Sequence, residues 1–334
     1  MPQLIEAISE PRDCAVPRKD PAPITAPESL KRFRQSKWFP LVWLVPVAIV
    51  VLLAVVLVTQ WMRTQPWMQD FLTQFPGESH LPDGALVGFP AWVGWQHFLN
   101  AFLILLIIKS GWQVRTNQRP VAYWTRNNSG PIRTRTSPKK ISLDLWFHLS
   151  IDVLWVLNGV VFFVMIFITG QWMRLVPVSW DVVPNAVSAA IQYASLDWPL
   201  ENGWVNYNAL QLLAYFVTVF VAAPLAVITG LRMSPAWSAK WARVNAVYKV
   251  EYARAVHFPV MLYFVLFIIT HVSLVLTTGA LRNLNHMYAA QDDGGWLGFW
   301  LFAASLALMI AAWVSARPML LRPLASLTGK ITRN

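Results

Sequence analysis

Cysteine is almost absent from this sequence, and its absence excludes several kinds of redox protein. Cys14 is the only cysteine among 334 residues. The chain can therefore form no internal disulfide, hold no iron–sulfur cluster by its own thiolates, and carry no covalent group at a CxxCH motif. Glycine-rich nucleotide or phosphate loops are also missing. No short apolar segment with a cleavage site opens the chain, so we expect the first apolar helix to be retained.

Charged residues are scarce too, at 13% of the chain, while hydrophobic residues make up 56% and mean hydropathy is +0.45. This composition is typical of a membrane protein rather than a soluble enzyme. A helix needs about 20 apolar residues to cross the hydrocarbon layer. Six segments meet that requirement: 40–61, 92–110, 146–169, 208–230, 256–278 and 297–315. The sequence therefore predicts an all-α, polytopic membrane helix bundle with six transmembrane helices.

Basic residues are distributed very unevenly if these spans alternate in direction. The termini and two of the loops hold 24 of the 27 Lys and Arg residues, which leaves only Arg63, Arg174 and Arg282 on the other side. An excess of Lys and Arg marks the cytoplasmic face. We therefore expect a multi-pass protein with both termini in the cytoplasm. Topology and contact with anionic membrane lipid explain this charge, so nucleic acid is not an expected partner.

Histidine is limited to six residues, yet four of them fall within the spans or at their edges: His97, His148, His257 and His271. Alternating topology places His97 and His271 near the outer face, and His148 and His257 near the inner face. His257 and His271 are fourteen residues apart. On a helix this spacing gives a separation of roughly 21 Å with both rings on one side.

An ionisable side chain at bilayer depth is costly, and a neutral imidazole is a common axial ligand of haem iron. The pattern therefore predicts two non-covalent haem b groups. His97 and His271 are the expected ligands of the outer haem, and His148 and His257 those of the inner haem. The alternative is that each histidine is a polar residue that hydrogen-bonds between helices.

A second regularity marks the ends of four spans. A Ser or Thr followed by Gly stands at each, and glycine there suits a left-handed helix C-cap. The pairs are Ser110-Gly111, Thr169-Gly170, Thr229-Gly230 and Thr278-Gly279, and an arginine follows each pair. Because arginine pairs well with carboxylates, we interpret Arg174 and Arg282 as partners of the outer haem propionates, and Arg115, Arg232 or Arg254 as inner partners. The alternative is snorkelling at the interface.

Two further polar residues are candidates for proton or quinone chemistry. Asp152 lies one helical turn after His148. It could orient that imidazole or help to protonate a bound quinone, and it could equally be a neutral acid bonded to a neighbouring helix. His286, in an outer loop beyond His271, is a candidate for quinone binding or proton exchange at the outer site.

With these ligands placed, the chain resembles the bacterial di-haem cytochrome b superfamily. The segments that carry the resemblance are HFLNAFLILLIIKSG at 97, HLSIDVLWVLNGVVFFVMIFITGQW at 148, YNALQLLAYFVTVFVAAPLAVITGLRMSP at 207 and RAVHFPVMLYFVLFIITHVSLVLTTG at 254. The superfamily includes cytochrome b subunits of Ni,Fe-hydrogenase, formate dehydrogenase (gamma) and thiosulfate reductase, and the last is the most similar. The resemblance implies the same histidine pairing and a menaquinone or ubiquinone site near one haem. It also implies a separate catalytic subunit containing molybdopterin or another metal centre, and a location in the bacterial inner (cytoplasmic) membrane.

The resemblance covers only part of the chain, which gives the expected domain organisation. We expect a flexible cytoplasmic tail at 1–38, an extra transmembrane helix at 39–62, a four-helix di-haem core at 92–285, a last transmembrane helix at 296–316 and a cytoplasmic tail at 317–334. The extra first helix departs from formate dehydrogenase gamma, which begins with its first haem helix.

The expected function is that of an electron-transfer subunit, in which two b haems connect a quinone pool to a catalytic partner and the chain is not catalytic alone. One alternative is a self-sufficient quinone-linked oxidoreductase that acts on a small oxidant such as superoxide. Another is a transporter or anchor without haem, for which charged mid-bilayer sites would be expected. Asp152 apart, the spans carry few such charges.

Overall fold

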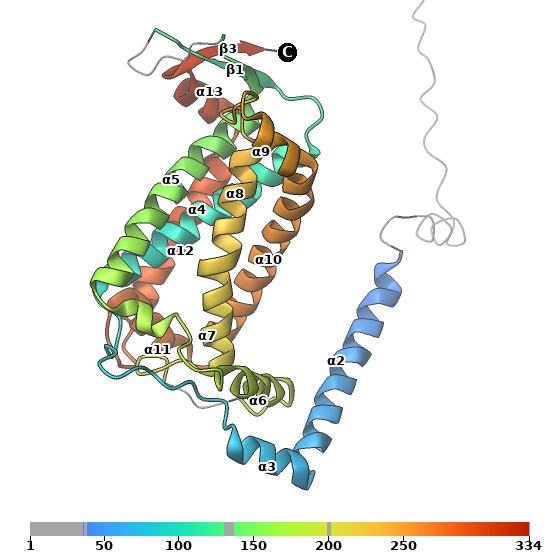
Figure 1. Ribbon diagram of the computed structural model, residues 1–334, viewed down its shortest axis with the longest axis vertical. Coiled ribbons are helices and arrows are strands. Elements are labelled where there is room, and N and C mark those ends of the chain that lie inside the picture. Colours follow the sequence, from blue (N-terminus) through green and yellow to red (C-terminus); the bar gives the residue numbers. More distant parts are fainter. Residues whose placement is uncertain (1–35, 37–38, 130–136, 199–201, 334) are drawn as a thin grey trace, which may run out of the picture. The chain divides into compact units, whose positions relative to one another are not determined.

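The computed structural model describes residues 36, 39–129, 137–198 and 202–333 (Figure 1). The tail predicted at 1–38 therefore lies outside the described residues, apart from Ser36. The chain divides into two units, one up to Leu57 and one from Val58 onward. The functional residues considered below all belong to the second unit.

Six helices, counted over the described residues, are long and apolar enough to cross a membrane. They are α2 (Leu41–Arg63), α4 (Ala91–Thr116), α5 (Leu143–Ile168), the continuous α7 (Ala209–Phe216), η2 (Val217–Ala222) and α8 (Ala223–Met233), α10 (Val250–Thr277), and α12 (Leu297–Ser315). The predicted fold class, an all-α polytopic membrane bundle, is confirmed. The chain is a multi-pass membrane protein.

Several helices run further than the apolar segments that predicted them. Helix α4 continues to Thr116 and α10 begins at Val250, because hydropathy marks only the apolar part of a helix. Gly111 and Gly230 consequently lie inside α4 and α8, so their prediction as C-caps is wrong. The C-cap prediction holds for the two other glycines. Gly170 follows α5 and Gly279 follows α10, with φ of 75° and 125°. Positive φ is the conformation that favours glycine.

The bundle is assembled by contacts of α4 with α5, of α10 with α8 and of α12 with α4 (Figure 1). One buried cluster joins α4 to α5 through Leu103, Leu106 and Phe147, and a second joins η2 to α10 through Ala222 and Phe264. Many other apolar side chains on these helices are exposed. This is expected of a bundle whose outer surface faces lipid rather than water.

A small sheet lies at the end of the bundle where α5 begins. Strands β2 (Lys140–Ser142), β1 (Ala122–Arg126) and β3 (Gly329–Arg333) form an antiparallel sheet in the order β2-β1-β3, and α13 (Pro318–Ser326) packs on it (Figure 1). Helix α9 (Ala242–Val247) lies at the same end. The segment 317–334, predicted as a tail, therefore contains a helix and a strand. Its strand pairs with residues some 200 positions earlier in the chain, which no local pattern indicates.

The opposite end carries the short elements α3 (Pro66–Gln74), η1 (Gln171–Arg174), α6 (Val182–Ala194), α11 (Ala280–Leu284) and η3 (Asn285–Ala289). Asn285 is fully buried there, and its side-chain oxygen accepts a hydrogen bond of 2.5 Å from the backbone N–H of Gly298. A Cβ on Gly298 would stand only 2.5 Å from the backbone of Asn285. This close approach fixes the start of α12 against η3.

We predict that Gly298→Ala destabilises the protein by roughly 1–3 kcal/mol, because the added methyl group must displace backbone atoms. The measurement is thermal unfolding in detergent. Gly294→Ala is the matched control, since a Cβ at Gly294 meets nothing within 4 Å. Equal unfolding temperatures for the two variants would contradict the prediction.

Candidate functional site

The structure brings both predicted histidine pairs together. In each pair one imidazole comes from α10 and the other from α4 or α5. The rings of His97 on α4 and His271 on α10 have centroids 6.1 Å apart, with an interplanar angle of 54°. The rings of His148 on α5 and His257 on α10 are 6.4 Å apart at 88°. One long helix thus supplies one imidazole to each pair.

These separations can be compared with what a shared iron requires. A bond from a metal to an imidazole nitrogen measures roughly 2 Å, and the ring centroid lies about 1 Å further on, so two rings on opposite sides of one metal have centroids about 6 Å apart. The separations of 6.1 and 6.4 Å match this value. The four histidines therefore fit two bis-histidine haems in spacing and in ligand type.

The inner pair has hydrogen-bonding partners that the sequence analysis missed. The hydroxyl oxygen of Ser110 lies 2.9 Å from Nδ1 of His148, and that of Thr229 lies 2.8 Å from Nδ1 of His257. Both residues belong to the Ser/Thr-Gly pairs that were assigned to helix ends. The recurrence of the motif could have indicated a function, but its place beside the histidines depends on helix packing.

The outer pair is surrounded by aromatic rings instead. Phe267 stacks on His271 with centroids 5.7 Å apart, and Tyr215 meets the same imidazole edge-on at 5.9 Å. Tyr288 lies 5.9 Å from His97. Among the described residues, none hydrogen-bonds to Nδ1 of His97.

Arg174 has partners other than those expected of a propionate-binding residue. It is 2% exposed and donates to the backbone carbonyls of Gly88, Gly203 and Trp204 at 2.6–2.9 Å. Its guanidinium also lies over the ring of Phe89. Burial lowers the pKa of Arg174. In these contacts the side chain joins the loop that contains Gly88 to the loop that contains Gly203 and Trp204.

The other predicted arginines lie in more open positions. Arg282 pairs with Asp292 at 2.8 Å, with its side chain 49% exposed. At the inner end, the guanidinium of Arg115 lies 3.8 Å from the ring centre of Phe258, the neighbour of His257 in sequence. Arg232 donates to the carbonyl of Tyr248 at 2.7 Å, and Arg254 is exposed on α10. The roles of these arginines as propionate partners stay predictions.

Asp152 does not orient the ring of His148 in the way that the sequence analysis considered. Its carboxylate lies 3.6 Å from Nε2, which is beyond a hydrogen bond and on the nitrogen that would face a metal. Nδ1, the atom that an orienting group contacts, is held by Ser110. A part for Asp152 in proton transfer to a quinone stays a prediction.

His286 is not a solvated loop residue. It is 4% exposed, and its Nε2 lies 2.7 Å from the carboxylate of Asp292, which also pairs with Arg282. Burial lowers the pKa of His286, while hydrogen bonds from Arg282 and His286 hold the pKa of Asp292 well below its usual range. His286 also lies 5.4 Å from Trp204, ring to ring.

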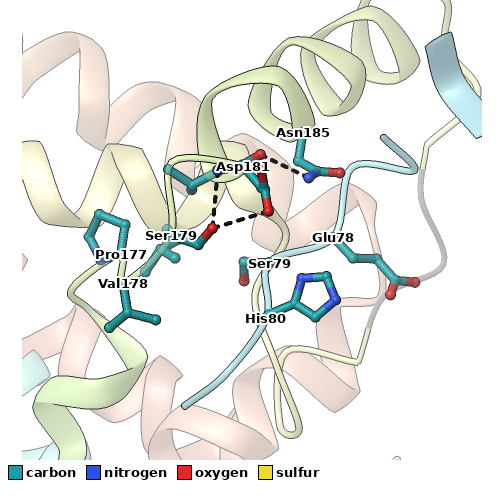
Figure 2. A pocket seen from close by; sticks show the side chains of 10 residues that line it. Glu78, Ser79, His80, Pro177, Val178, Ser179, Asp181 and Asn185 are labelled. Atoms are coloured by element: carbon teal, nitrogen blue, oxygen red, sulfur yellow. Dashed lines mark hydrogen bonds between the residues drawn. The ribbon is translucent and has the colours of Figure 1, made fainter. Parts of the chain in front are cut away.

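A small cavity lies among the outer loops and is lined by residues that include Glu78, Ser79, His80 and Asp181 (Figure 2). Ser179 and Asp181 share a hydrogen bond of 3.1 Å on its wall. The cavity volume of about 10 Å³ is that of a single water molecule. It is too small for a quinone or another organic ligand.

Comparison with known proteins finds a distant relative among reductase subunits. No family model matches the chain, and no solved structure matches it. A curated protein of Azospira oryzae, described as "Putative protein-methionine-sulfoxide reductase subunit YedZ1", is 26% identical over 201 residues. The match covers 56% of this chain and 88% of that protein. The chain is thus similar over more than half its length to a reductase subunit.

The pH dependence of stability should depend on the cluster of His286, Asp292 and Arg282. The folded state lowers the pKa of His286 from its ordinary 6.5 and that of Asp292 from 3.8. The unfolded chain therefore binds more protons as the pH falls below about 6.5, so stability is lost in that direction. We expect the unfolding temperature to fall between pH 7.5 and pH 5.5, and to fall less in His286→Asn.

The control for this prediction is His80→Asn, because His80 is an exposed loop residue. It should retain the pH dependence of the unmodified protein. If His286→Asn retained the full pH dependence as well, His286 would not be the group responsible.

Proposed function

We propose that this chain is the membrane electron-transfer subunit of a reductase, with two b-type haems held by histidine pairs. The outer haem is bound by His97 and His271, and the inner haem by His148 and His257. The observation that carries the proposal is that both pairs show ring separations of 6.1 and 6.4 Å, which a shared iron requires.

Helix α10 sets the path of the electrons in this proposal. It carries His257 and His271 fourteen residues apart, so one continuous helix holds one ligand of each site at a separation of roughly 21 Å. Haem, when bound, supplies reversible one-electron chemistry. The chain supplies the ligands, their spacing across the bilayer, and an apolar surround built from residues such as Phe264 and Phe267.

The similarity to a reductase subunit supports a direction of electron flow and a catalytic partner subunit. The relative's name makes that protein a subunit of a reductase for methionine sulfoxide in proteins. We infer that this chain likewise serves a catalytic subunit containing molybdopterin or another metal centre. His97, His271, His148 and His257 would hold the haems, whose one-electron chemistry would connect a membrane quinol, as the donor, with that subunit. A four-helix haem core at 92–285, flanked by the helices at 39–62 and 296–316, is part of the same proposal.

Charge supports the proposed orientation in a bacterial inner membrane, with both termini cytoplasmic. The small sheet at one end of the bundle carries Arg126, Lys140, Lys330 and Arg333. Basic residues are favoured at the cytoplasmic face and beside anionic lipid. His148 and His257 lie towards this end, which makes theirs the inner haem.

The candidate arginines for the haem propionates fall into an outer group and an inner group. We propose Arg282 for the outer haem, because its side chain is half exposed and can exchange Asp292 for a propionate. Arg115 is the corresponding inner residue, with Arg232 and Arg254 as further candidates. Arg174 is retained as an outer candidate only through its Nε, since its other nitrogens already bond to three backbone carbonyls.

The proposal predicts two haem b groups per chain in the purified protein. A redox-titrated optical spectrum with haem quantified by pyridine haemochrome should show two low-spin components. His271→Ala should remove the outer component and leave one haem, because His148 and His257 still form a pair.

His80→Ala is the control and should keep both haems, since His80 is an exposed loop residue outside the membrane-spanning helices. A pure, folded protein without haem would overturn the proposal. Turnover of a small oxidant by the isolated chain would favour a self-sufficient oxidoreductase instead.

A further inference from the structure

Two helices present the same pair of groups to the inner histidines. On α4, Ser110 and Gly111 face His148, and on α8, Thr229 and Gly230 face His257. We call each Ser/Thr-Gly pair a hydroxyl–glycine seat. The two seats belong to helices that are adjacent to the helix of the imidazole they contact, α5 in one case and α10 in the other.

The hydroxyl groups are well placed to act as acceptors toward the imidazoles, because each has a carbonyl of its own helix to which it can donate. The hydroxyl of Ser110 lies 2.8 Å from the carbonyl of Leu106, and that of Thr229 lies 2.5 Å from the carbonyl of Leu225, four residues earlier on the same helix in each case. A hydroxyl has one hydrogen to donate and lone pairs left to accept. With that hydrogen given to the helix, the oxygen accepts from Nδ1–H of the histidine.

The proton position on each ring follows from this bond. A neutral imidazole carries one proton, and Nδ1 holds it here, so Nε2 keeps a free lone pair. This is the tautomer that coordinates a metal through Nε2. The hydroxyl thus selects the state of the ring that a ligand needs.

The glycines bring the rings close to the neighbouring helix. A Cβ on Gly111 would stand 3.2 Å from Cε1 of His148, and one on Gly230 would stand 3.4 Å from Cε1 of His257. The first distance is tighter than an ordinary contact and the second is at its lower limit. A side chain at position 111 would therefore push the ring away from the hydroxyl.

We propose that Ser110 and Thr229, each with its glycine, are positioning residues that fix the tautomer and orientation of the two inner axial ligands. This inference rests on the proposed function and assigns a role that is specific to the inner site. Nδ1 of His97, in the outer pair, has no hydrogen-bond partner among the described residues. The two haems are thus given different ligand environments by the same bundle.

The consequence is a difference in redox behaviour. A hydrogen bond from Nδ1–H makes the imidazole a stronger electron donor, which favours the ferric state of the bound iron. Loss of the hydroxyl should therefore raise the midpoint potential of the inner haem. We expect the ratio of reduced to oxidised inner haem at a fixed potential to rise about threefold to tenfold, or roughly 30 to 60 mV at 59 mV per decade.

The test uses the full-length chain with His271→Ala, so that a single inner haem titrates. Ser110→Ala and Thr229→Val are added separately, and the potential and the electron paramagnetic resonance spectrum of the ferric haem are measured. Both variants should raise the potential and shift the g values. Thr229→Ser keeps the hydroxyl and should retain the original potential.

The controls are Ser150→Ala and Thr277→Val, whose hydroxyls bond to carbonyls of their own helices at 2.8 and 2.7 Å without contacting a histidine. The inference fails if Ser110→Ala and Thr229→Val leave potential and spectrum unchanged, or if the controls shift them equally. Loss of haem from Thr229→Val but not from Thr229→Ser supports it. Absence of haem from the unmodified chain would overturn the proposed function itself.

Discussion

An imidazole inside a hydrocarbon layer needs a partner, and the rest of this bundle is arranged to meet that need. Water is not available at that depth, so each ring must hydrogen-bond, coordinate a metal or remain unsatisfied at high cost. Four histidines impose this requirement on three helices, α4, α5 and α10. The requirement is met by placing α10 opposite the packed pair of α4 and α5, so that its two histidines face His97 and His148 with rings about 6 Å apart.

The two histidine pairs have different surroundings at the two ends of the bundle. Beside His148 and His257, hydroxyl groups on neighbouring helices lie within hydrogen-bond distance of the imidazoles, and glycines allow the close approach. At the outer end, aromatic rings surround His271, and the polar bonds lie one layer further out. There Arg174 joins loops through backbone carbonyls, and His286 is buried against Asp292. The loops at this end are held by these buried polar groups together with a buried apolar cluster between α6 and α7.

Local sequence patterns predicted the helices but not all of their neighbours. The six spans follow from apolar length alone, and the depth of each histidine follows from the alternation of the spans. The hydroxyl–glycine seats could be seen as a recurring motif, yet their position inside α4 and α8 was mistaken for a helix end. Glycine fits both situations, and only the course of the backbone beyond Gly111 distinguishes them. The sheet of β1, β2 and β3 escaped prediction because its strands pair over long sequence distances.

The sequence alone determined the class of the protein, the number of spans and the identity of the four candidate ligands. These properties depend on composition and on helical period, which are local. The tertiary structure decided which groups touch each ring: Ser110 rather than Asp152 at Nδ1 of His148, and three carbonyls at Arg174. Such contacts are set by how helices and loops distant in sequence pack against one another, because a hydrogen bond needs its donor and acceptor at the right distance and angle, which residue type alone does not fix. Because cysteine and intramembrane charge are scarce, the four histidines stand out as candidate ligands, and helix packing determines which groups contact them.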